Sequence, residues 1–253
     1  MSTVVVHTGN ILSSEHLKRR VNLGPQQELV DALKVSLQDS QKHISGDGTC
    51  RQVLECGDYS EKDAVQLGDD AREDLKVTVK IFLTDVSKGA TRSAVTQSLA
   101  KLKLSTIDLI LLSVPSNKLS DFEEAWRELE AQAKAGAVQS IGVSDFDLNE
   151  FEALYNAAQV KPSVNQVNLE SCCVIPPELS DFAKKNNVQL LTHNDPRVML
   201  EPDSVRDILS TAAPALKAEE YFASWLVRYT AMIKLRGVVT SRGFIFSVQK
   251  VQQ

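Results

Sequence analysis

Short apolar runs alternate with segments of helical periodicity along most of the chain. Each run has the length of a strand, and most do not alternate strictly between apolar and polar residues, which is typical of strands buried on both faces. From the second run to the seventh, the starts lie roughly 25 to 30 residues apart, about the length of one strand–helix–strand unit. The pattern predicts strands at Thr3–His7, Val53–Cys56, Val77–Leu83, Ile107–Leu112, Val138–Val143, Ser163–Val167, Val188–Thr192 and Gly237–Thr240.

The segments between the runs carry the signals of helices. Ser120–Glu123 and Asp147–Glu150 fit capping boxes, and Ser60 with Asp63 opens a further helix. A last helix before the eighth strand is predicted by five residues that share one helical face. These are Phe222, Trp225, Leu226, Tyr229 and Ile233.

This alternation of strand and helix, with no linker, favours a closed parallel barrel over an open doubly wound sheet. The length of 253 residues suits one such barrel. We therefore expect an α/β protein with a single domain over residues 1–253, an eight-stranded (β/α)8 TIM barrel. Few residues follow the eighth strand, so the C-terminus should be shortened and lack a full eighth helix.

Composition narrows the range of partners and compartments. Apolar residues make up 43% of the chain and charged residues 24%, the balance of an ordinary globular domain. The net charge of −5 gives no attraction to nucleic acid. The N-terminus resembles no signal peptide, and no apolar run is long enough to span a membrane. We expect a cytoplasmic protein.

The four cysteines have irregular spacing, which predicts neither a metal site nor a disulfide framework. Cys172 and Cys173 are adjacent, and their Cα atoms, about 3.8 Å apart across a trans peptide, are too close for an easy disulfide. Either one thiol packs inside while the other lies in a loop, or a thiol faces a partner.

The functional face of a barrel lies at the carboxyl ends of its strands. There the sequence places several polar residues but no convincing acid–base pair. His193 and Asp195 lie in an Asn-Asp-Pro turn, where an aspartate commonly bonds its own backbone, so a structural role is favoured. Lys80 lies inside an apolar run, and a buried lysine needs a partner or a lowered pKa.

Four segments resemble the aldo-keto reductase family, and the similarity extends over about Leu75–Thr192. Asp108–Pro115 resembles the strand that carries the active-site histidine, and Gly142–Phe146 resembles that family's Gly-Val-Ser-Asn-Phe. Val164–Val167 resembles its Asn-Gln-Val strand, and Val79–Ile81 the strand bearing its catalytic lysine. The resemblance implies a barrel of aldo-keto reductase type, with Lys80 as the counterpart of the lysine.

The departures from that family are informative. Ser113 replaces the histidine and cannot act as an imidazole. Asp58 and Tyr59 are adjacent, whereas the family separates its aspartate and tyrosine by four residues. Val239–Arg242 does not reproduce the signature that binds the NADP phosphate, and the long C-terminal tail is absent. These differences imply no catalytic residues, no bound cofactor and no metal, with Lys80, Ser144 and Gln166 as remnants of a cofactor pocket.

A more specific resemblance is to the modifier (regulatory) subunits of glutamate–cysteine ligase. It is carried by Ser163–Leu179, Gln189–Pro196, Thr91–Val95 and His7–Asn10. The resemblance implies a non-catalytic subunit that forms a heterodimer with the catalytic ligase subunit. It further implies improved use of glutamate and weaker feedback inhibition by glutathione, and thus promotion of glutathione synthesis.

The sequence leaves two alternatives open. Lys80, Ser144 and Gln166 could still hold a nicotinamide, because the last two match positions that contact the carboxamide in the reductases. A redox-sensing adaptor acting through Cys172 or Cys173 is the other alternative. For the interface with a partner, the candidates are the flank beside the first and seventh helices and the loops that include Ser171–Pro177.

Overall fold

The computed structural model describes residues 3–14, 23–40, 53–56, 72–84, 86, 88–114, 119–168 and 174–251. Strands and helices alternate through most of this range, as the sequence predicts. The elements are β1 (Thr3–His7), α2 (Pro25–Ser40), β2 (Val53–Cys56), a 3-10 turn η1 (Arg72–Asp74), β3 (Leu75–Leu83), α3 (Ala90–Leu102), β4 (Ile107–Ser113), α4 (Leu119–Lys134), β5 (Val138–Ser144), α5 (Leu148–Ala157), β6 (Val164–Asn168), α6 (Pro177–Lys185), β7 (Gln189–His193), α7 (Pro202–Ala212), η2 (Ala218–Glu220), β8 (Tyr221–Ile233) and β9 (Val238–Lys250).

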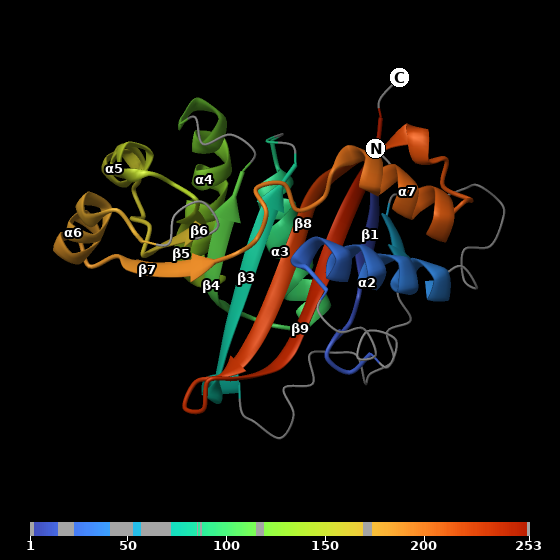
Figure 1. The fold of residues 1–253 in the computed structure, drawn as a ribbon, viewed down its shortest axis with the longest axis horizontal. Coiled ribbons are helices and arrows are strands. Elements are labelled where there is room, and N and C mark those ends of the chain that lie inside the picture. Colours follow the sequence, from blue (N-terminus) through green and yellow to red (C-terminus); the bar gives the residue numbers. More distant parts are fainter. Residues whose placement is uncertain are drawn as a thin grey trace.

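One sheet contains all nine of these strands, in the order β2-β1-β9-β8-β3-β4-β5-β6-β7 (Figure 1). Strands β3 to β7 are parallel neighbours in chain order, as in a reductase-type barrel. The long antiparallel hairpin β8–β9 lies between β3 and β1, and it is antiparallel to both. The α/β class and the parallel succession of strand and helix are therefore confirmed.

The structure differs from the prediction in the C-terminal part of the chain. Residues 221–233 form strand β8 rather than a helix, and the predicted eighth strand is the start of the antiparallel β9. Within the described residues β2 and β7 are the edges of the sheet, so the ring of eight parallel strands is not closed. The physical reason is a period of two: Trp225, Val227 and Tyr229 pack in one apolar cluster, while Leu226 packs in the other.

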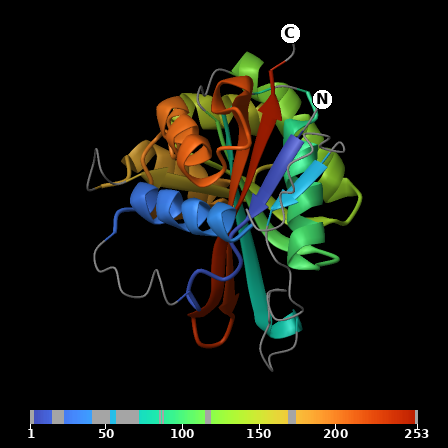
Figure 2. The same ribbon diagram turned by 90° about the vertical axis from the view of Figure 1, so that its right-hand side faces the viewer.

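Two large apolar clusters lie on the two faces of the sheet, and Figure 2 shows the helices that flank it on either side. The larger one joins β3 to β5 with α3, α4 and α5, and the fully buried Phe122 and Phe151 lie in it. The second joins β1 and β9 with α2 and α7, through Leu33 and Ile208. Helices α2 and α7 contact each other directly, and Lys34 Nζ lies 2.7 Å from Asp207 Oδ2. The two helices therefore form a packed pair, and the flank beside them stays a predicted interface.

Of the three predicted helix N-termini, the structure confirms one, shifts another and does not describe the third. At α5 both halves of the capping box are present, since Asp147 accepts from the Glu150 backbone and Glu150 from the Asp147 backbone. Helix α4 begins at Leu119, so Ser120 lies inside the helix rather than at its cap. Ser60 and Asp63 lie outside the described residues. Among the helices of the described ranges, none has the length and apolarity needed to span a membrane.

Candidate functional site

A buried ion pair lies near the carboxyl end of the central strand β3. Lys80 Nζ is 2.9 Å from Asp195 Oδ2, and both side chains are only 3% exposed. Arg228 of β8, which is opposite Lys80 in the register, binds both oxygens of Asp195, with Nη2 to Oδ2 at 2.7 Å. One carboxylate therefore compensates two cations that come from adjacent strands. Its two bonds to Arg228 have the bidentate geometry that favours arginine.

His193, at the end of β7, extends this arrangement to the end of β5. Its Nε2 lies 2.9 Å from Asp145 Oδ1, and its Nδ1 accepts a hydrogen bond of 3.0 Å from the Asp195 backbone N–H. The Ser144 hydroxyl donates to Asp145 Oδ2 at 3.0 Å. Lys80, Asp145, His193, Asp195 and Arg228 are together called the Asp195 cluster below.

The turn that supplies Asp145 has an unusual backbone. Asp145 has a φ of 65°, in the left-handed region that an aspartate tolerates better than most residues. Its backbone N–H donates to the carbonyl of Gln166 on β6 at 2.8 Å, and its carboxylate accepts from the Asn168 backbone at 3.1 Å. Neighbouring strands therefore fix the carboxylate against His193.

Opposing effects set the pKa values in the Asp195 cluster. Burial alone would raise the pKa of Asp195, but the adjacent His193, Arg228 and Lys80 side chains hold it well below its usual range. For Asp145 burial likewise acts upward, yet His193 and Lys80 lower its pKa. Burial would lower the pKa of His193, but its bonds to Asp145 and Asp195 raise it. Burial lowers the pKa of Lys80 in spite of Asp195.

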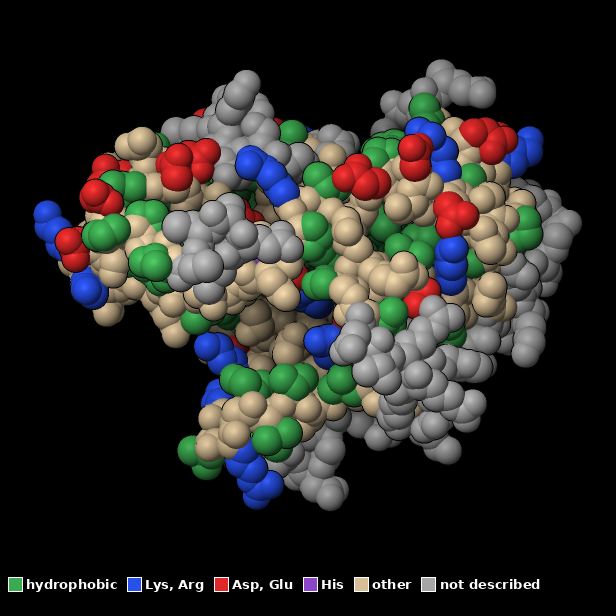
Figure 3. All heavy atoms as spheres, viewed as in Figure 1, with side chains coloured by type: hydrophobic (Ala, Val, Ile, Leu, Met, Phe, Trp, Pro, Cys, Tyr) green, Lys and Arg blue, Asp and Glu red, His purple; other side chains and the backbone are tan. Residues whose placement is uncertain are grey.

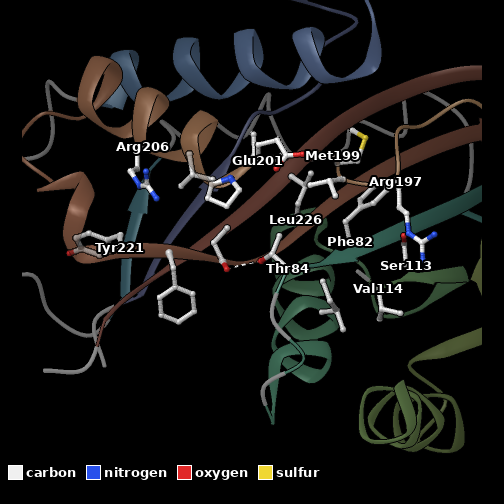
Figure 4. Close-up of a pocket in the computed structure, with 17 residues that line it drawn as sticks. Phe82, Thr84, Ser113, Val114, Arg197, Met199, Glu201, Arg206, Tyr221 and Leu226 are labelled. Atoms are coloured by element: carbon white, nitrogen blue, oxygen red, sulfur yellow. Dashed lines mark hydrogen bonds between the residues drawn. The ribbon is translucent and has the colours of Figure 1, made fainter. Parts of the chain in front are cut away.

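A cavity of about 450 Å³ lies beside this cluster, at the carboxyl ends of β3 and β4 (Figure 4). Phe82 lines it, and the same ring lies 5.1 Å from Lys80 Nζ and 5.7 Å from the Arg228 guanidinium carbon. The walls are mostly apolar, and the polar residues among them are Thr84, Ser113, Arg197, Glu201 and Arg206. The remaining lining comes from the loop before α7, from α7 itself and from the first half of β8. Together these surfaces form one pocket at the end of the sheet where the sequence predicted a functional face.

Comparison with known proteins gives the family. Residues 56–194 match the model of the aldo/keto reductase family. The glutamate–cysteine ligase regulatory subunit of Mus musculus is 36% identical over 98% of this chain and 93% of its own length. The Homo sapiens protein of that name is 35% identical, with the same coverage of both chains. The chain belongs to the family of glutamate–cysteine ligase regulatory subunits, within the aldo/keto reductases. Among solved structures, an aldo-keto reductase from a deep-sea metagenome library is 32% identical over 50% of this chain and 46% of its own, with a TM-score of 0.45.

The three residues predicted to be remnants of a cofactor pocket form hydrogen bonds or an ion pair with other residues of this chain. Lys80 is bound to Asp195, and the Ser144 hydroxyl to Asp145. Gln166 contributes its backbone carbonyl to the Asp145 turn, while its buried Oε1 has no hydrogen-bond partner in the described part of the chain. Among the described residues, no group of three potential ligand side chains could hold a metal ion.

Two interpretations from the sequence need correction. The Asp195 carboxylate bonds Lys80 and Arg228 across the sheet rather than its own turn. Arg228 was missed as a site residue because it was assigned to a helix; the unpaired charge of Lys80 was the signal that a further partner exists. Asp58, Tyr59, Cys172 and Cys173 lie outside the described residues, so the roles expected of them stay predictions.

Proposed function

We propose that this chain is a non-catalytic regulatory subunit of glutamate–cysteine ligase in the cytoplasm. It binds the catalytic subunit as a heterodimer, improves the use of glutamate and relieves feedback inhibition by glutathione. The observation that carries the proposal is the extent of the similarity, which covers 98% of this chain and 93% of the Mus musculus relative. A fragment shared only with active reductases would support the fold alone.

The absence of reductase activity is the first expected result. Lys80 and Ser144 are 3% and 1% exposed, and both are bonded within the Asp195 cluster. Ser113, in place of the family's histidine, lines the cavity as a hydroxyl. Without a positioned proton donor, about 10²–10⁴-fold of general acid catalysis is lost. We expect no measurable reduction of common aldehydes by NADPH. The measurement is the absorbance of NADPH, which falls when the cofactor is oxidised. Turnover at ordinary reductase rates would contradict the non-catalytic proposal.

Reciprocal linkage is the second expected result, and it tests how the chain regulates. A partner shifts a conformational equilibrium only through its differential affinity for the two states. If the chain binds the glutamate-competent state of the catalytic subunit more tightly, glutamate affinity should rise by about 5–150-fold, a coupling of about 1–3 kcal/mol. Glutamate must then tighten assembly of the heterodimer by the same factor.

Two titrations measure this coupling. Calorimetry gives the Kd of the heterodimer with and without saturating glutamate, and the Kd of glutamate with and without the chain. Equal factors support the population shift. A lower glutamate Kd in the complex, with assembly indifferent to glutamate, would exclude it. Complete failure of the two proteins to associate would exclude the proposed function itself.

A further inference from the structure

A hairpin projects from the end of the sheet opposite to the Asp195 cluster. Strands β8 and β9 are joined there, and Ile233, the last residue of β8, pairs with Leu75 at the start of β3. Lys80 lies farther along β3, toward its carboxyl end. Figures 1 and 2 show the turn between β8 and β9 at the lower end of the molecule, below the flanking helices. Residues 234–239 are called the hairpin tip below.

The hairpin tip is apolar and exposed. All six of its residues are exposed, and Leu235, at 93%, is more exposed than any other large apolar side chain in the described ranges. Val238 and Val239 are 52% and 40% exposed. Single apolar residues on a surface are ordinary, but three exposed apolar residues within five positions of one projecting turn are a denser grouping. Exposed apolar surface on a projecting element is typical of contact sites for other proteins.

Positive charge flanks the apolar residues of the tip. Lys234 and Arg236 lie on either side of Leu235. Lys234 Nζ lies 4.0 Å from Asp108 Oδ1, whereas no carboxylate of the described ranges forms an ion pair with Arg236. Lys234 donates to the Glu73 carbonyl at 2.7 Å, while Glu73 and Asp74 lie in η1, at the base of the hairpin. Figure 3 shows hydrophobic and basic side chains together on the projecting part. The tip is thus basic on a chain whose net charge is −5.

We propose that the hairpin tip is the element by which this chain docks onto the catalytic ligase subunit. Its apolar side chains enter a hollow on that subunit, and a carboxylate beside the hollow meets Arg236. This inference rests on the proposed function and adds the place and chemistry of the contact. Charge complementarity of this kind guides association and fixes the orientation of the partners.

The geometry of the hairpin suits this role. Strands β8 and β9 pair over most of their length, and β8 is also paired with β3. A tip held by such a ladder loses little conformational freedom on binding, which lowers the entropic cost of association. Because the tip lies at the amino end of β3, docking there leaves the cavity at the other end open.

Three variants of the full chain, each titrated with the purified catalytic subunit, test the proposal. Leu235→Asp places a carboxylate in the apolar hollow, and we expect binding to weaken by at least about tenfold. Arg236→Glu should weaken binding and reduce its dependence on salt, because a contributing ion pair is reversed. Val174→Asp is the matched control: Val174 is 68% exposed and lies in the rival loop before α6, and we expect a change below about twofold.

The outcomes separate this inference from the proposed function. If the wild-type chain and Leu235→Asp bind equally, the hairpin tip is not the docking element, although the heterodimer stands. If Val174→Asp weakens binding as much as Leu235→Asp does, the assignment to the tip also fails. If the wild-type chain does not bind, both proposals fall. Leu235→Ser, which adds no charge, and thermal melts of every variant show whether a loss of binding reflects unfolding.

Discussion

Replacing Asp195 with asparagine should lower the free energy of unfolding by about 3–5 kcal/mol, because it leaves the buried Lys80 and the partly buried Arg228 without their counter-charge. Asp195 is 3% exposed and is the carboxylate that binds both Lys80 and Arg228. Asparagine keeps the shape of the side chain, so the loss in the free energy of unfolding comes from the missing charge and not from a change in volume. Denaturant unfolding of both proteins at neutral pH measures the difference.

A surface pair supplies the control for this result. Asp207 bonds Lys34 at 2.7 Å, but its side chain is 61% exposed, and exposed ion pairs add little to stability. We expect Asp207→Asn to leave the unfolding curve nearly unchanged. If Asp195→Asn is equally mild, then water or rearrangement compensates the cations, and the buried cluster does not stabilise the fold.

The sign of the pH dependence follows from the same groups. The pKa of Asp195 is lowered in the folded state, so its contribution is present above the unfolded pKa and is lost as the pH falls toward the folded value. His193 has a raised pKa, so its contribution is present at low pH and is lost as the pH rises through the folded value. Asp195→Asn should therefore flatten the acid side of the stability profile of the wild-type chain.

Replacing Tyr229 with alanine should also cost about 3–5 kcal/mol, in line with the loss of a large buried aromatic residue. Tyr229 is 1% exposed on β8, its ring centroid lies 5.6 Å from that of His7, and its hydroxyl donates to the Gly9 carbonyl at 2.7 Å. Truncation leaves a cavity between β8 and the loop after β1. Thermal and denaturant unfolding measure the loss.

A graded series separates packing from hydrogen bonding at this position. Tyr229→Phe keeps the ring and removes the bond to Gly9, and it should cost about 1 kcal/mol. Tyr155→Phe is the control, because within the described residues the Tyr155 hydroxyl makes no hydrogen bond, and we expect no change. Equal losses for Tyr229→Phe and Tyr229→Ala would mean that the ring itself contributes nothing to the core.

Features that depend on residues close together in the sequence, such as helix caps and single strands, could be predicted from the sequence. The capping box at Asp147 and Glu150 involves neighbouring residues, and it is present. The buried parallel strands of the central half follow from apolar runs such as Leu109–Leu112, because only a strand covered on both faces accepts that pattern. The need of Lys80 for a partner was likewise visible, since a charge in an apolar strand must be compensated.

Non-local pairings could not be predicted in the same way. Trp225 and Tyr229 are four residues apart, which fits a helix, but Val227 between them is also buried, which fits a strand. The spacing alone does not decide between the two, because the choice depends on pairing with β3 and β9. Asp195 is separated from Arg228 by 33 residues and from Lys80 by 115, so the cluster is formed only by the completed sheet.

The position of the β8–β9 hairpin has a consequence for biosynthesis. Strand β1 joins the sheet through β9, and Thr3 pairs with Gln249 near the other end of the chain. The first strand to leave the ribosome must therefore wait for the last one, while β3 to β7 can pair as they emerge. Long-range pairing of this kind slows folding and leaves unpaired edges exposed in the interval. A nascent chain arrested before residue 238 would hold its N-terminal strand without its main neighbour, open to chaperones and to other chains.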